Sequence, residues 1–159
     1  MRKLLLSLLL ACGAAQAQSV AEVKYTVQKI DVHDSDLSTS AGALAMSRGA
    51  PWYKQDEQVL ERIVAIWGEL QGWIFAAEST GRLATQMQSS ADSRLAIEEF
   101  RLAARFLNQQ TDLSAFKVSQ ELPKLTVPAL VAEATRVRDS MLALKNDTQS
   151  AVHAREKTQ

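Results

Sequence analysis

Four residues that can bind a metal ion lie close together in the first third of the sequence: Asp31, His33, Asp34 and Asp36. Hard cations prefer carboxylate oxygens, so this group predicts a metal site. The segment has neither the loop glycine nor the final glutamate of an EF-hand, and its spacing matches no zinc motif. A solvent-exposed turn at the end of a helix, with Ser35 and Asp36 as capping residues, accounts for the same residues without a metal, and we favour it.

A second candidate ligand is His153, near the end of the sequence. The segment 148–155 resembles, over about eight residues, the haem-ligating end of four-helix cytochromes. The resemblance implies a haem held by His153 and by a methionine near the mature N-terminus, for which Met46 is the nearest candidate. No Cys-x-x-Cys-His sequence is present for covalent attachment. We favour an exposed His153 at the end of a helix, where its charge interacts with the helix dipole, and we predict no cofactor.

Other catalytic arrangements are missing from the sequence. It contains no nucleophile elbow, phosphate-binding glycine loop, zincin helix or paired Glu-x-x-His motif. Tuned pairs of Asp or Glu can hydrolyse substrates without other groups, so hydrolysis of the cell wall or of a glycan is an alternative. We predict that the protein is not an enzyme.

Residues 1–17 have the three parts of a secretory signal peptide. Arg2 and Lys3 supply positive charge, an apolar stretch follows, and Ala15-Gln16-Ala17 is a small-x-small cleavage site. Its compact form is typical of bacteria, so we predict export to the periplasm. The mature chain, residues 18–159, then has 16 basic and 18 acidic residues, because two of the 18 basic residues leave with the signal. A near-neutral chain without a basic stripe predicts no nucleic-acid partner.

Cys12 allows an alternative to soluble release, in which the exported protein is anchored by a lipid. Residues 9–12 resemble a bacterial lipobox, in which the cysteine is lipidated and anchors the protein to the envelope. The apolar stretch is short for such a signal, so we favour soluble release. No mature segment reaches the roughly 18 consecutive apolar residues that a membrane-spanning helix needs, and we predict no transmembrane segment.

The strongest periodic pattern predicts a helix from residue 56 to residue 88, with Asp56 as its cap. Mostly apolar residues recur there in steps of three and four: Val59, Ile63, Ile66, Leu70, Trp73, Ala77, Thr80, Ala84 and Met87. The tripeptide 79–81 is a point at which this helix can kink or stop. A second stripe of small and aromatic residues faces away from the first and includes Gly68, Gly72 and Phe75. We favour an internal neighbour packed on this stripe, with a partner protein or a second copy as the alternative.

Two further helices are predicted in the second half of the sequence. One covers residues 91–110, and Glu99 lies within its apolar sector, either buried beside a partner or, as we favour, at the rim in contact with water. The other covers residues 128–153, with Pro128 in its first turn. Residues 111–127 are predicted to connect them, with Asp112 as a cap and a short helix at most.

The first part of the mature chain is the most ambiguous. Val20, Val23, Val27 and Ile30 fit helical spacing, whereas residues 23–27 also alternate like a strand. We favour a helix, because no partner strand is evident. Trp52 and Tyr53 follow a break at Pro51; we expect them to pack on the next helix, with exposure to a partner as the alternative.

Together these patterns predict an all-α protein, an antiparallel bundle of three long helices plus an N-terminal helix in one domain. The predicted function is a non-enzymatic interaction role in the bacterial envelope, as an adaptor or assembly factor that binds an envelope protein or itself. The alternative is a haem- or metal-binding bundle that uses His33 or His153.

Overall fold

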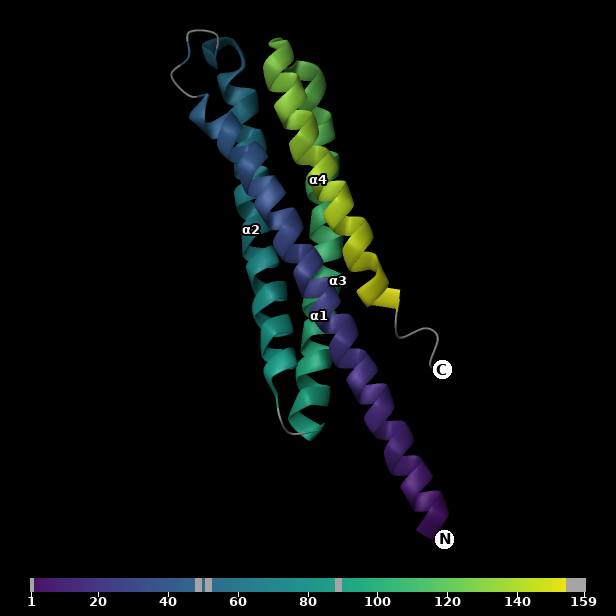
Figure 1. Cartoon of the computed structure of the whole chain (residues 1–159). Coiled ribbons are helices and arrows are strands. Elements are labelled where there is room, and N and C mark those ends of the chain that lie inside the picture. Colours follow the sequence, from purple (N-terminus) through teal and green to yellow (C-terminus); the bar gives the residue numbers. More distant parts are fainter. Residues whose placement is uncertain (1, 48–49, 51–52, 88–89, 154–159) are drawn as a thin grey trace.

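The computed structural model describes residues 2–47, 50, 53–87 and 90–153, and within these ranges it is helical without a strand. Four long helices pack against one another (Figure 1). They are α1 (Arg2–Met46), α2 (Glu57–Gln86), α3 (Ser90–Glu121) and α4 (Pro128–His153), with short 3-10 helices at Tyr53–Gln55 and Leu122–Lys124. The predicted all-α class is confirmed.

Each helix has two close neighbours. α2 packs against α3, α3 against α4, α4 against α1 and α1 against α2, whereas α1 and α3 lie across the diagonal and touch little. The N-terminal part of α1 extends beyond the ends of the other helices (Figure 1). Apart from this extension of α1, each helix meets two neighbours along its length, so it needs a continuous inward apolar stripe and has one outward face left over.

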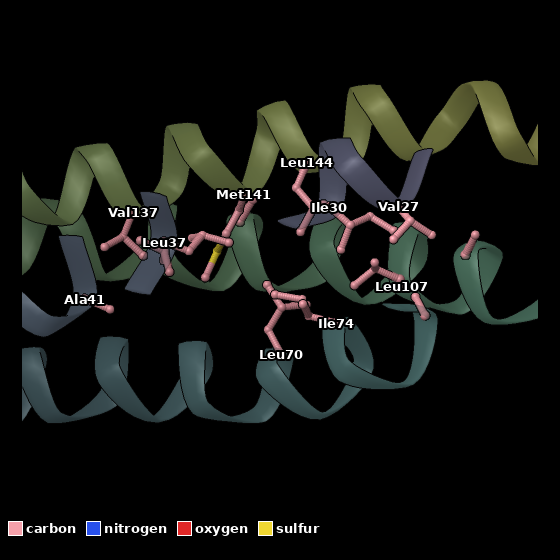
Figure 2. Packing of buried hydrophobic residues seen from close by; sticks show 14 of the residues in the cluster. Val27, Ile30, Leu37, Ala41, Leu70, Ile74, Leu107, Val137, Met141 and Leu144 are labelled. Carbon is pink, nitrogen blue, oxygen red and sulfur yellow. The ribbon is translucent and has the colours of Figure 1, made fainter. Parts of the chain in front are cut away.

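The inward stripes meet in one hydrophobic cluster, part of which is drawn in Figure 2. All four helices contribute fully buried side chains to it, among them Ile30, Leu37, Leu70, Ile74, Leu107, Met141 and Leu144. Burial of an aliphatic side chain of this size stabilises the fold by about 1.5–3 kcal/mol. This cluster therefore positions every surface described below.

α1 is longer and more regular than the sequence suggested. Residues 20–32 are helical, so the strand alternative is excluded. The turn predicted at residues 31–36 is wrong, because α1 continues to Met46 without a break. Leu37, Ala41 and Leu44 repeat the inward spacing of Ile30 and are fully buried, and this packing outweighs the turn-forming tendency of the Asp and Ser residues between them.

α2 has no break at residues 79–81, where the sequence allows a kink or stop. Gly81 instead marks a close approach of three helices. A Cβ atom placed on this glycine would collide with the side chain of Val27 on α1 and would lie 2.9 Å from two ring carbons of Phe100 on α3. The absence of a side chain at this position is what lets α1, α2 and α3 come together there.

α3 is also longer than predicted, because residues 111–121 continue it. Thr111, Ser114 and Val118 are buried, and the Thr111 hydroxyl donates a hydrogen bond of 2.7 Å to the carbonyl of Leu107. Asp112 lies inside the helix and pairs with Lys145 of α4, so it is not a cap. The helical spacing of buried residues thus continues through residues 111–121, although several of these residues are polar.

Asp56 precedes α2 as predicted, but its side chain makes no capping bond to that helix. The buried carboxylate instead accepts hydrogen bonds from the backbone N–H groups of Thr126 and Val127, both at 2.9 Å, and from the Thr126 hydroxyl at 2.8 Å. Burial raises the pKa of Asp56, but these three bonds outweigh it and hold the pKa below its ordinary value. Asp56 thereby joins the start of α2 to the start of α4.

Candidate protein-binding surface

The outward face of α3 carries a row of large apolar side chains. At steps of three and four along this face lie Leu95, Glu99, Leu102, Phe106, Gln109, Leu113, Phe116 and Gln120. We call these eight residues the outer seam. Its five apolar members are exposed to between 43% and 64%, the extremes being Phe106 and Leu95. The inward face of α3 supplies the core with other residues, and no apolar member of the outer seam belongs to the buried core cluster.

α2 extends this surface sideways. The Trp73 and Phe106 rings lie 6.0 Å apart at an interplanar angle of 33°, which joins the two helices by an aromatic contact at the surface. Near the opposite end of α3, Ile66, Ala65 and Phe116 line a groove of about 350 Å³ between the helices. We call the outer seam of α3, together with Ala65, Ile66 and Trp73 of α2, the α2–α3 trough.

Ion pairs between α2 and α3 border the groove. Arg62 donates to the Glu121 carboxylate from Nε at 2.9 Å and from a terminal nitrogen at 2.8 Å, and Lys124 donates to it at 2.7 Å. Burial raises the pKa of Glu121, but the bonds from Arg62 and Lys124 lower it by more. On the other side, Lys117 lies 3.6 Å from Glu69. Because these charged residues are paired with one another, a partner would contact mainly the apolar residues of the groove, Ala65, Ile66 and Phe116.

The glycine stripe of α2 lies on its outer face. Gly68 and Gly72 are exposed, and a methyl group added to either would meet no neighbouring atom within 4 Å. Phe75, on the same stripe, is 72% exposed. The favoured prediction of an internal neighbour on this stripe is wrong. Because the stripe is exposed, a partner can reach it, and it lies on the same helix as the α2 side of the trough.

The aromatic pair before α2 lies largely outside the described residues. Trp52 is outside them, and for Tyr53 only the backbone, which begins a 3-10 helix, is described. Their predicted packing or exposure stays a prediction. Glu99 is exposed on the outer seam, as favoured from the sequence.

The four predicted metal-binding residues lie on different sides of α1, so their side chains point in different directions. Asp31 accepts a hydrogen bond from Arg82, and Asp34 accepts one from Gln71, both on α2 and both at 2.7 Å. Asp36 is exposed. Among the described residues, no three His, Cys, Asp or Glu side chains converge in a way that could hold a metal ion.

His33 points to the opposite neighbour, α4. Its Nε2 lies 2.8 Å from a carboxylate oxygen of Asp147, and Lys29 lies 3.7 Å from the same atom. The hydrogen bond with His33 lowers the pKa of Asp147, burial opposes it, and the charge of Lys29 adds to the lowering. His153 ends α4, and its side chain lies outside the described residues.

Glu78 is a notable group that sequence reasoning missed. It faces α1 from α2, beside Asp31 and Asp34, with Arg82 3.8 Å away on its own helix. Burial, a hydrogen bond with Asp31 and the charges of both aspartates raise the pKa of Glu78 to about 7, against the weaker effect of Arg82. The Glu78–Arg82 spacing of four residues is visible in the sequence, but its approach to α1 depends on how the helices pack.

Within the described residues, no helix combines the length and apolar character required to cross a bilayer. No known protein family matches the sequence, and comparisons with curated proteins and with solved structures find no similar chain.

Proposed function

We propose that this chain is an exported, non-enzymatic helical bundle that binds protein through the α2–α3 trough. The observation that carries the proposal is the outer seam of α3, where large apolar residues face water although the core is built from the opposite face. Contiguous apolar surface of this kind marks interaction sites on soluble proteins, and aromatic residues such as Trp73 and Phe106 are common anchors in interfaces.

The proposal also covers where the protein is located and how its helices run. Residues 1–17 act as a signal peptide and residues 18–159 form one antiparallel bundle in the periplasm; lipidation of Cys12 is the alternative route to the envelope. Expression of the full chain in an exporting bacterium tests this directly. The intact mass should correspond to a chain that begins at Gln18. A mass increased by lipid on Cys12 would support the anchored form, and an uncut chain in the cytoplasm would contradict export.

Site-specific photo-crosslinking in the same cells tests the binding surface. A photoreactive amino acid at Leu102 or Phe116 should form protein adducts, because both side chains point outward from α3. The matched controls are Arg136 and Asp139, which are exposed on the outer face of α4. Equal adducts from both helices, or none from α3, would contradict the proposal.

The haem- or metal-binding alternative stays a prediction. Absorption spectra and metal analysis of the purified protein, with His33→Ala and His153→Ala variants, decide it. A stoichiometric metal or a haem absorption band that disappears in one variant would replace the interaction role.

A further inference from the structure

We propose that the partner on the outer seam is a second copy of this chain, which pairs with it through α3 about a two-fold axis. This inference rests on the proposed function, because it names the occupant of the same surface. Its basis is the spacing of the apolar residues along α3 and the placement of the charges beside them.

The outer seam has the spacing of a coiled-coil face. Its steps alternate between four and three residues, which is the pattern that lets two helices interlock side chains along a shared seam. From Leu95 to Phe116 the seam extends over about 32 Å, at 1.5 Å per residue. A partner that matches this face over its whole length is a helix with the same spacing, and α3 of a second copy is such a helix.

Two copies of α3 that run in opposite directions place two of the three seam leucines, Leu102 and Leu113, against each other. With the two-fold axis between residues 107 and 108, Leu102 lies opposite Leu113 of the second copy, and Leu113 lies opposite Leu102 of the second copy. In the same register Leu95 lies opposite Gln120, Phe116 opposite Glu99 and Phe106 opposite Gln109. Phe106 then lies beside the axis, next to the ring of Trp73 from its own α2. An interface of this kind is self-complementary, as two-fold pairing requires.

The charges select this register. Arg105 and Asp112 flank the seam on the same side, and both are exposed. Asp112 also pairs with Lys145 of its own α4, and its side chain is still 58% exposed, so it can face a second cation. In this register Arg105 of each copy lies beside Asp112 of the other, which gives two attractive pairs. A shift of one heptad in one direction sets Arg105 against itself and Glu98 against Asp112, and a shift in the other direction sets Asp112 against itself. Both shifted registers bring like charges together, so charge complementarity favours the pairing described.

The outer face of α4 shows what an unpaired face of this bundle looks like. Its charged residues pair locally, Arg136 with Glu133 and Arg138 with Asp139, and its one large exposed apolar residue within the described part of the helix is Leu142. α4 therefore provides matched control positions on the same molecule.

Analytical ultracentrifugation of the purified full-chain product, across a hundredfold range of concentration, should show a monomer–dimer equilibrium. Leu102→Gln with Leu113→Gln should raise the dissociation constant at least about a hundredfold, because the central leucines are lost. Arg136→Gln with Asp139→Asn on α4 should leave it unchanged. Circular dichroism of each variant establishes that the helices are retained.

A charge exchange tests the register. Arg105→Asp and Asp112→Arg should each weaken the dimer about tenfold, since each creates like-charge contacts, and the double exchange should restore it. Asp112→Arg also removes the pair with Lys145 of the same chain, and the double exchange shares this loss, so circular dichroism accompanies every variant. Restoration cannot come from a misfolded chain, so the result does not depend on the stability of either single variant.

A monomer at every concentration, or a dimer that ignores the seam and charge variants, would overturn the second-copy inference. If α3 crosslinks in cells to another protein while the purified chain stays monomeric, the proposed function stands and the self-association fails. If neither crosslinks nor dimers form through α3, both fail.

Discussion

The adjacent helices α3 and α4 have similar inward faces and different outward faces. Both bury an apolar stripe in the shared core, with Leu107 and Met141 as examples. Outside, α3 exposes five large apolar residues, whereas α4 exposes only Leu142 among its described residues and pairs its charges instead. The difference teaches that the core residues of α3 and its proposed binding surface occupy separate faces of one helix, so mutations can test stability and binding separately.

The largest expected effect comes from replacing one leucine by alanine on each face of α3. Leu107→Ala should lower the free energy of unfolding by about 3 kcal/mol, because the side chain is fully buried and leaves a cavity. Leu102→Ala should cost less than about 1 kcal/mol, because its side chain is half exposed. Chemical denaturation of the protein at a concentration where it is monomeric measures both. Similar losses would show that the outer seam also holds the fold.

A smaller effect should distinguish the inner and outer glycines of α2. Gly81→Ala should destabilise by about 1–3 kcal/mol, because the new methyl group overlaps Val27 and Phe100. Gly68→Ala, on the open face, should instead stabilise by about 0.5–1 kcal/mol through helix propensity alone. Thermal unfolding of the two variants provides the comparison, and a destabilised Gly68→Ala would mean that something covers that face.

The pH dependence of stability should arise inside the bundle and leave the outer seam unaffected. The pKa of Glu78 is about 7 in the folded protein against an ordinary value of 4.5, so its contribution is fully present below pH 4.5 and is lost as pH rises through 7. We expect a loss on the order of 1–3 kcal/mol between pH 5 and pH 8. Glu78→Gln should flatten this change and be more stable than the parent at pH 8.

Urea unfolding at several pH values measures this effect, with Glu61→Gln, an exposed position on the same helix, as the control. An unchanged pH profile in Glu78→Gln would show that Glu78 is not its source.

The smallest effect is expected on the outer face of α4. Arg136→Ala removes an exposed ion pair with Glu133, so it should change stability by less than about 0.5 kcal/mol. It should also leave crosslinking from α3 unchanged. A loss of binding would break the comparison, because it would make α4 part of the interface.

The sequence predicted the elements that depend on repeated apolar spacing. α2 and α4 lie close to the predicted ranges, since their inward stripes are long and end at clear signals such as Pro128. The turn at residues 31–36 and the first part of the connection, residues 111–121, were mispredicted, because their polar residues resemble caps and loops when read locally. Both segments are helical because inward residues such as Leu37 and Val118 are buried by other helices.

The candidate surface was predicted only in part. The exposed position of Phe75 fits the alternative of a partner on its stripe and contradicts the favoured internal neighbour, and the sequence did not identify the outer seam of α3 as an exposed face. Which of two apolar stripes on one helix is buried depends on the direction from which its neighbours approach. That direction is set by contacts such as those at Gly81, which no local pattern contains.

The bond of Asp56 to the start of α4 has a consequence for hydrogen exchange. The amide hydrogens of Thr126 and Val127 belong to no helix, yet both are held by a buried carboxylate from a segment 70 residues earlier in the sequence. They should exchange with solvent as slowly as amides within α4, and only when the starts of α2 and α4 separate. These two amides therefore report the opening of one end of the bundle, and their protection, measured against the intrinsic exchange rate at each pH, should fall when acid protonates Asp56.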